Sequence, residues 1–146
     1  MNYEKAEQQI KSITQNSSNV FQDVVDFLCD NFKHYSWVGI YIVEGNDLVL
    51  GSWSGPNATE HARIPIGKGV CGSAVTTGKT EVVDDVHSDN RYLACFVSTK
   101  SEIVVPIKKQ SEIIGEIDID SDKTAAFNLE DSVFLEKIAN LISNSL

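Results

Sequence analysis

The segment "EIVVPIKKQSEIIGEIDID", residues 102–120, contains two β-rich runs separated by a polar pair at 110–111. Acidic and apolar residues alternate with unusual clarity at its end, in "EIDID". A period of two residues is typical of a strand with one buried face, and a short polar connection between two β-rich runs predicts an antiparallel hairpin. We therefore expect residues 102–109 and 112–120 to pair as neighbouring strands.

The chain outside this hairpin predicts helices at both ends of a sheet. Apolar residues recur at three- and four-residue spacings near the N-terminus, and Asn128 with Asp131 forms a capping signal for a last helix. The expected helices are 3–15, 20–32, about 70–77 and one that opens at 127–131, and the other expected strands are 36–44, 47–54, 62–66 and 80–86. The strands 36–44 and 47–54 are separated by "GN", which predicts a second hairpin. The expected apolar face of the last helix is Leu129, Val133, Phe134, Ile138, Leu141 and Ile142. This order of helices and strands predicts an α+β fold in which the N- and C-terminal helices pack on one face of a mainly antiparallel sheet.

Length and charge limit the classes of function. A chain of 146 residues is expected to form one domain, 1–146, with a packed core. Its 12 basic and 21 acidic residues give a net charge of −9, which argues against nucleic-acid and membrane-surface partners and favours a small zwitterionic or cationic ligand. The first fifteen residues lack the apolar run of a signal peptide, and no segment is apolar enough to span a membrane, so we expect a cytoplasmic protein.

The row Glu116, Asp118 and Asp120 is the first candidate for chemistry. Alternate residues of a strand share a face, about 6.5 to 7 Å apart, while Ile117 and Ile119 point the other way. Two interpretations are open. The acidic row is either a solvated outer face or a partly buried one, and burial would raise the pKa of one or more of its carboxyl groups.

The three cysteines are expected to be thiols at rest in a reducing compartment. Cys29 lies beside the apolar stripe of the second helix and is interpreted as a core residue. Cys71 follows "GKG" near the start of a small helix, where it is either a thiol activated by the helix N-terminus or a small buried residue. Cys95 lies in "RYLACFVSTKSE", residues 91–102, whose periodicity is neither helical nor extended, so it is either a small apolar core residue or a thiol presented by a loop.

Other signatures are absent from the sequence. There is no CxxC pair, and the histidines show no zinc-ligand spacing with the cysteines, so a structural metal site is not expected. A hydrolase GxSxG is missing, and "GKG" is too short for a phosphate-binding loop. Thiol redox chemistry or a plain ligand pocket remains. Trp37 and Tyr41 share a strand face and are expected to frame a shallow gap over Gly39, which lies between them. They either pack against a helix or form an aromatic wall for a small apolar group such as a thioether methyl.

Together these motifs resemble a known enzyme family. The segments "WVGIYIVEGNDLVLG", "RIPIGKGVCGSAVTTG", "VDDVHSDNRYLAC", "SEIVVPI" and "GEIDIDS", spread from Trp37 to the last helix, are similar to the free methionine-(R)-sulfoxide reductases, which are built on a single GAF domain. The resemblance implies a GAF-like fold and a thiol enzyme that needs no cofactor. Its implied reaction is the reduction of the R epimer of free L-methionine sulfoxide to L-methionine.

The resemblance also assigns roles to residues. Cys95 matches the catalytic cysteine, which would become a sulfenic acid, and Cys71 matches a second cysteine that would resolve it to a disulfide, to be reduced by thioredoxin or a similar dithiol. The substrate-site carboxylates match Glu102, Asp118 and Asp120, and the pocket aromatics match Trp37 and Tyr41. Many relatives carry a further cysteine where this chain has His61, so resolution is expected to fall to Cys71.

Two other functions are compatible with the same residues. One is a GAF sensor that binds a small molecule without catalysis, with Cys71 and Cys95 as packing residues. The other is a peroxide-sensing thiol protein. The joint presence of the cysteine, the glutamate and both aspartates favours the reductase, because a bare sensor needs none of that set. The terminal helices also offer a possible homodimer surface.

Overall fold

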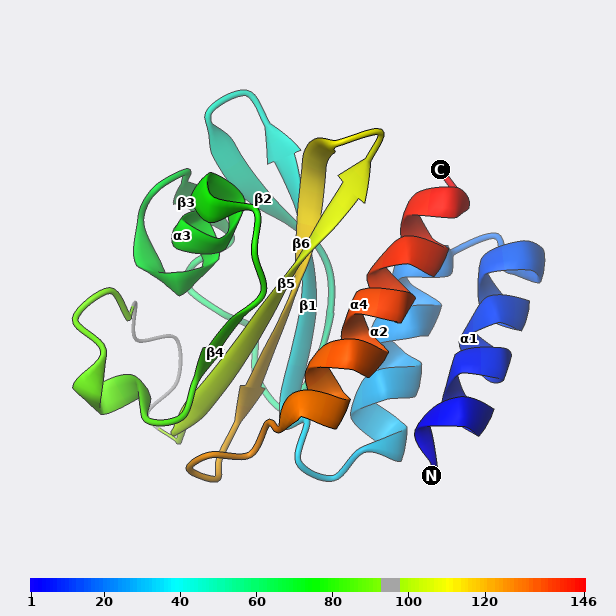
Figure 1. Ribbon diagram of the computed structural model, residues 1–146, viewed down its shortest axis with the longest axis horizontal. Coiled ribbons are helices and arrows are strands. Elements are labelled where there is room, and N and C mark those ends of the chain that lie inside the picture. The colour runs from blue at the N-terminus through cyan, green and yellow to red at the C-terminus, as the bar shows by residue number, and fades with distance from the viewer. Residues whose placement is uncertain (93–97) are drawn as a thin grey trace.

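The computed structural model of the chain describes residues 1–92 and 98–146 (Figure 1). The helices are α1 (Tyr3–Asn16), α2 (Val20–Asn31), α3 (Gly69–Thr77), the short 3-10 helix η1 (Val86–Ser88) and α4 (Leu129–Asn144). The strands are β1 (Trp37–Glu44), β2 (Asp47–Ser54), β3 (Arg63–Pro65), β4 (Glu81–Val83), β5 (Ser101–Lys109) and β6 (Glu112–Ser121).

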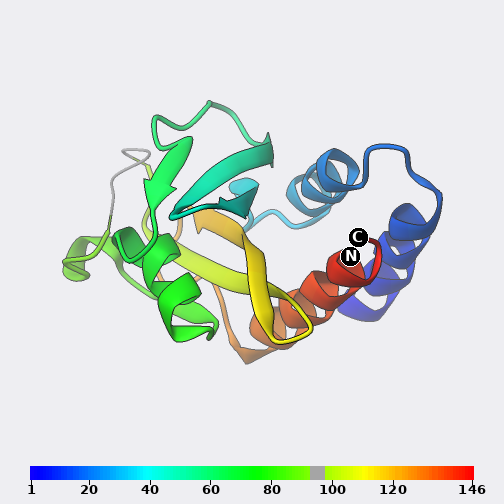
Figure 2. The ribbon, with the colours of Figure 1, turned by 90° about the horizontal axis from the view of Figure 1, so that it is seen from above.

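Within the described residues the strands form one sheet of six, in the order β3-β2-β1-β6-β5-β4, and every neighbouring pair is antiparallel. The predicted hairpins β1–β2 and β5–β6 are both present, and β1 pairs with β6 at the centre of the sheet. Helices α1, α2 and α4 lie together on one side of the sheet, and α3 lies on the other (Figures 1 and 2). The predicted α+β class and its antiparallel sheet are confirmed.

The face under α1, α2 and α4 carries the larger core. Because side chains alternate along β6, Ile117 and Ile119 point into this core and are fully buried. Strand β1 contributes Val38 and Ile40 to the same core. Burying an aliphatic side chain of this size contributes roughly 1.5 to 3 kcal/mol, so this face supplies most of the hydrophobic stabilisation. The described helices are all too short or too polar to cross a lipid bilayer.

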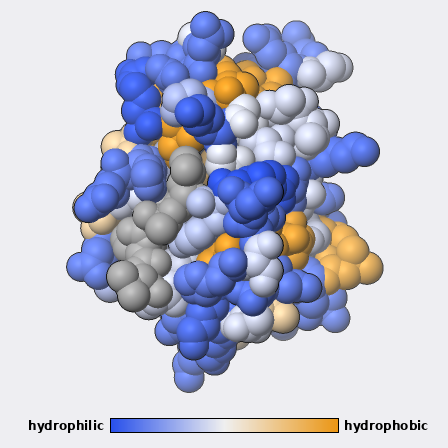
Figure 3. Space-filling model, turned by 90° about the vertical axis from the view of Figure 1, so that its left-hand side faces the viewer, coloured by the Kyte–Doolittle hydropathy of each residue, from blue (hydrophilic) through white to orange (hydrophobic). Residues whose placement is uncertain are grey.

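The opposite face carries a smaller core beneath α3 and β3. Trp37 and Tyr41 from β1 pack there with Cys71 from α3. Seen from outside, this side of the molecule is mainly hydrophilic with small separate apolar patches (Figure 3). The side chains that matter for function lie beneath that surface.

One predicted strand is shorter than expected. The run 80–86 was expected to be extended throughout, but β4 ends at Val83. The Asp85 carboxylate accepts a hydrogen bond from the His87 backbone N–H and so caps η1. This local capping competes with strand pairing at the end of the run.

Candidate active site

The acidic row of β6 is buried. Glu116, Asp118 and Asp120 are 0%, 2% and 2% exposed, because α3 and its flanking chain cover the face from which they project. Of the two interpretations of this row, burial is therefore correct and the solvated outer face is wrong. Buried carboxylates are rare without partners, so the row is a feature that core packing alone does not explain.

Strand β5 brings a fourth carboxylate to the acidic row through its pairing with β6. Glu102 pairs directly with Asp120, and Val104 with Asp118, so the Glu102 side chain joins the acidic row from the neighbouring strand. Glu102 is 5% exposed. The Thr99 hydroxyl lies 3.5 Å from Asp120 Oδ2 and donates to it.

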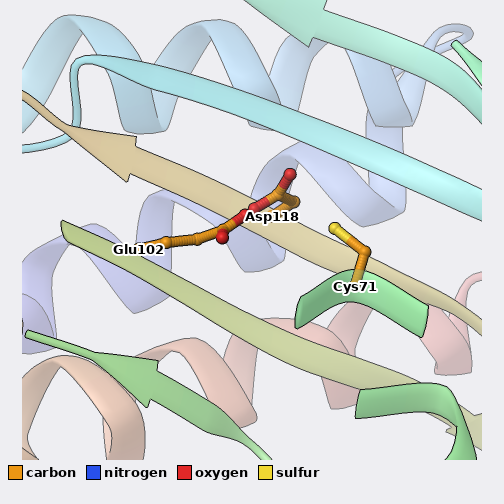
Figure 4. Close-up of side chains that lie close together, drawn as sticks. All are labelled: Cys71, Glu102 and Asp118. Carbon is orange, nitrogen blue, oxygen red and sulfur yellow. The ribbon is translucent and has the colours of Figure 1, made fainter. Parts of the chain in front are cut away.

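Helix α3 places Cys71 against these acids. Gly69 adopts a φ of 68° at the start of the helix, and a Cβ on Gly72 would lie 2.7 Å from the Gly67 backbone nitrogen, so the glycines allow α3 to fold back closely on the chain that leads into it from β3. The Cys71 Sγ atom and one oxygen each of Glu102 and Asp118 all lie within 4.8 Å of one another (Figure 4). We refer to Cys71, Glu102, Glu116, Asp118 and Asp120 as the acidic cluster.

Burial changes the proton affinity of the acids. It raises the pKa of Asp118, and it raises the pKa of Glu116 and Asp120 well above the ordinary value, to which the negative charge of Asp118 adds. Hydrogen bonds with Glu102 partly offset the rise at Asp118 and Asp120. A carboxyl group with a raised pKa retains its proton closer to neutral pH, so the cluster can act as a proton donor.

Cys71 is not activated in the way its position suggested. Burial raises its pKa well above the usual thiol value, and the charges of Asp118, Glu116 and Glu102 raise it further. Of the two interpretations of Cys71, the small buried residue therefore agrees with the structure better than the activated thiol. The thiol is 5% exposed and faces carboxylates, and these two effects outweigh the helix dipole.

The two aromatic residues lie beside the acidic row. In the β1–β6 register, Trp37 pairs with Asp120 and Tyr41 with Glu116, so both flank the carboxylates on the same face. The gap expected between them is filled, because a Cβ on Gly39 would lie 2.3 Å from the tip of the Trp37 ring. The Tyr41 hydroxyl donates to the His61 backbone carbonyl at 2.8 Å and ties down the chain before β3.

Cys95, the predicted catalytic cysteine, lies outside the described residues. The chain just before it is held by Arg91, which forms ion pairs with Asp89 at 2.7 Å and Glu81 at 3.0 Å. Arg91 also donates to the Ser73 hydroxyl on α3, two residues after Cys71. This network fixes residue 91 to the helix that carries Cys71.

A small cavity lies beside the acidic row. Its volume is about 30 Å³, which is room for a few water molecules. It is lined by Ser36, Trp37, Pro56, Asn57, Ser98, Thr99, Asp120, Ser121 and Asp122. An amino acid is several times larger, so side chains around this cavity must move for one to reach Asp120.

Glu116 is the member of the acidic cluster to which the sequence assigned no catalytic or binding role. It was placed on the same face as the two aspartates, but neither its spacing nor the family resemblance gave it a role. Its two carboxylate oxygens are buried, and among residues 1–92 and 98–146 they have no hydrogen-bond donor other than the Cys71 thiol. Its position opposite Tyr41 comes from the pairing of β1 with β6, which are distant in the sequence, and its burial depends on α3. Neither could be derived from the local pattern.

Comparison with known proteins connects this arrangement to a family. A family model described as GAF domain matches residues 16–146. The free methionine-R-sulfoxide reductase of Saccharomyces cerevisiae is 43% identical over 114 residues, which cover 75% of this chain and 62% of that protein.

Two solved structures share the whole architecture. The type II free methionine-R-sulfoxide reductase of Thermoplasma acidophilum is 41% identical, with a TM-score of 0.83 over 96% of this chain and 94% of that one. The free methionine-R-sulfoxide reductase of Neisseria meningitidis, solved in complex with its substrate, is 34% identical, with a TM-score of 0.92 over 98% of this chain and 87% of that one. The chain therefore belongs to the GAF-domain family and, within it, to the free methionine-R-sulfoxide reductases.

Proposed function

We propose that the chain reduces the R epimer of free methionine sulfoxide to methionine at the acidic cluster. The observation that carries the proposal is the buried row of Glu102, Asp118 and Asp120, in a chain whose relatives are named for this reaction. A fold that needed only packing would place apolar residues at these positions. Retaining buried acids costs stability and is typical of sites under functional constraint.

Substrate selection follows from charge. A free amino acid carries an ammonium group, and buried carboxylates in a low-dielectric pocket bind such a cation strongly. The same sulfoxide within a peptide has no ammonium beside the side chain, and it would leave these carboxylates unpaired. The aromatic faces of Trp37 and Tyr41 suit the thioether end of the substrate.

The first chemical step is assigned to Cys95. Its sulfur attacks the sulfoxide sulfur while a protonated carboxyl of the acidic cluster donates to the sulfoxide oxygen. The oxygen passes to Cys95, so methionine leaves with its sulfur reduced by two electrons and Cys95 becomes a sulfenic acid. The raised pKa values of Asp118 and Asp120 support the presence of a proton donor at neutral pH.

The second step is assigned to Cys71. Its sulfur attacks the Cys95 sulfenic acid, the S–S bond forms, and the sulfenic oxygen leaves as water with the proton of the thiol. A carboxylate of the cluster is placed to relay that proton, which the high pKa of Cys71 otherwise retains. Thioredoxin or a similar dithiol then reduces the disulfide to two thiols.

The test is an epimer-resolved assay. The purified protein is incubated with each epimer of free methionine sulfoxide and dithiothreitol, and methionine is quantified. The R epimer is consumed, whereas the S epimer and peptide-bound sulfoxide are not. Cys95→Ser abolishes the reaction.

Cys29→Ser is the matched cysteine control. The Cys29 thiol lies on the helical side of the sheet, 3.7 Å from the Tyr35 carbonyl oxygen, and far in the fold from the acidic cluster, so this variant retains full activity. Full activity in Cys95→Ser would contradict the catalytic assignment. Binding of the sulfoxide without formation of methionine would instead identify a non-catalytic GAF sensor.

A further inference from the structure

Three potential metal ligands meet in the acidic cluster from separate elements. Cys71 from α3, Glu102 from β5 and Asp118 from β6 converge with one ligand atom each, all within 4.8 Å of one another (Figure 4). Each of the three side chains is at least nine-tenths buried. Their spacing along the sequence resembles no zinc motif, because the fold alone brings them together.

Glu116 supplies an independent indication of a ligand. It is fully buried, and among the described residues its carboxylate oxygens have no hydrogen-bond donor other than the Cys71 thiol. Glu116 projects from the same face of β6 as Asp118, two residues before it, on the side of the sheet that α3 covers. Ion pairs among residues 1–92 and 98–146 give neither Glu116 nor Asp118 a cationic partner. Buried carboxylates in this state need protons or a cation.

We propose that the acidic cluster binds one zinc-type divalent cation through the three converging groups, and that the Glu116 side chain, two residues before Asp118 on the same strand face, rotates in as the fourth ligand. Zinc accepts cysteine sulfur at about 2.3 Å and carboxylate oxygen at about 2.0 to 2.2 Å, in a tetrahedron whose ligand atoms lie roughly 3.5 Å apart. The three convergent atoms lie within 4.8 Å of one another, so they must approach by about 1.3 Å at most, which side-chain rotation supplies.

The donor set determines which cation binds. A sulfur ligand favours zinc over magnesium, which prefers oxygen ligands in an octahedral arrangement. Binding displaces the protons held by the thiol and the carboxyl groups, so the affinity for zinc rises with pH.

If the proposed function holds, zinc in the acidic cluster inhibits catalysis. Glu102 and Asp118 are the carboxylates assigned to the substrate, and Cys71 is the resolving thiol. A cation on these groups excludes the substrate ammonium and blocks the thiol. Zinc therefore inhibits the reductase reversibly, and a chelator restores it.

The binding test uses cobalt as a spectroscopic substitute for zinc. Chelator-treated, fully reduced protein is titrated with Co²⁺, and Zn²⁺ affinity is then measured by competition with a chromophoric chelator. We expect one equivalent of cobalt with a thiolate-to-metal charge-transfer band that Cys71→Ser removes. Glu116→Gln weakens zinc binding at least tenfold. A band that persists in Cys71→Ser, or unchanged affinity in Glu116→Gln, would overturn the proposal.

Two variants serve as matched controls. Glu112→Gln changes an exposed carboxylate at the start of the same strand, and Cys29→Ser changes a thiol on the opposite side of the sheet. Both retain the affinity and the spectrum of the unaltered protein. Circular dichroism confirms that each variant is folded.

Inhibition is measured separately in a single-turnover assay without added thiols, which would chelate the metal. Reduced protein is mixed with the R sulfoxide with and without one equivalent of Zn²⁺, and methionine per chain is counted. A loss of at least tenfold in rate, reversed by chelator, is expected. Metal binding without inhibition would contradict the claim that zinc and the substrate compete for the same side chains. If the metal-free protein makes no methionine, the proposed function is contradicted. The cobalt titration then still tests the metal site by itself.

Discussion

At the scale of single residues, the acidic row of β6 reverses the usual relation between burial and stability. Glu116, Asp118 and Asp120 occupy interior positions where apolar groups would stabilise the fold. Their raised pKa values show that the folded state disfavours the ionised form of each. Below about pH 4 these groups are protonated in both the folded and the unfolded state. As pH rises from there through the folded-state pKa values, the free energy of unfolding decreases.

Replacing Glu116 with glutamine removes one of these charges. We expect Glu116→Gln to be about as stable as the unaltered protein near pH 4 and more stable on the order of 1 kcal/mol near pH 8, because the amide is never ionised. Urea unfolding at both pH values measures the difference. Glu112→Gln on the exposed start of β6 shows no such gain. A variant less stable than the unaltered protein at pH 8 but equally stable at pH 4 would show that Glu116 is stabilising in its ionised form and would contradict the prediction.

Gly39 tests the position of the Trp37 ring. A Cβ at residue 39 would lie 2.3 and 2.6 Å from two atoms at the ring tip, so Gly39→Ala displaces the ring from its place beside Asp120. We expect a loss of about 1 to 3 kcal/mol in stability and at least a tenfold loss of kcat/KM, with a change in tryptophan fluorescence. Gly51→Ala is the control, because its nearest neighbour would be 3.4 Å away. Wild-type kcat/KM in Gly39→Ala would exclude a role for the ring position.

At the scale of elements, the start of α4 is fixed by one buried carboxylate. Asp131 accepts hydrogen bonds from the Tyr3 and Tyr35 hydroxyls at 2.8 and 2.7 Å, and it contacts His34 at 2.9 Å. It also completes the predicted capping box with Asn128. Burial alone would raise the pKa of Asp131, but these donors together lower it to about 2. One side chain thus joins α1, α4 and the chain before β1.

The sign of the pH effect at Asp131 is opposite to that at Glu116. The ionised Asp131 adds roughly 2 kcal/mol to the free energy of unfolding. This contribution is present above the unfolded-state pKa near 4 and is lost as pH falls through the folded-state pKa of about 2. We expect Asp131→Asn to unfold more easily at pH 7, with the difference shrinking towards pH 2 in urea titrations. Glu130→Gln, its exposed neighbour, leaves stability unchanged. A difference independent of pH would mean that packing, not charge, accounts for the loss.

The elements themselves were largely predictable, since their periodicity is local. Both long hairpins, the first two helices and the capping box of the last helix were expected from sequence and are present. The failures occur where a competing local or tertiary effect decides the outcome. Asp85 ends β4 early through a capping hydrogen bond. In α4, Leu129 and Val133 were expected on the apolar face but are 78% and 46% exposed, because the face that packs runs through Phe134 and Ile138 instead.

At the scale of the whole molecule, one face of the sheet stabilises the fold and the other carries the candidate active site. The face under α1, α2 and α4 holds the aliphatic core, and the face under α3 holds the acidic cluster (Figures 1 and 2). Alternation along β6 predicted which residues share a face. It did not predict that the acidic face is buried, since that depends on α3 and its glycine-rich approach packing over it. The family resemblance supplied the substrate carboxylates, but the convergence of Cys71 with Glu102 and Asp118 required the fold.

The most direct test of the proposed reductase is a single turnover followed by peptide mapping. Fully reduced protein is mixed with excess free methionine R-sulfoxide without added reductant, the thiols are blocked, and both methionine and the disulfides are quantified. We expect one methionine per chain and a disulfide between Cys71 and Cys95, with Cys29 still a thiol. In Cys71→Ser, one methionine still forms and no disulfide follows. No methionine from the R epimer, or methionine formed while Cys95 remains a thiol, would contradict the account.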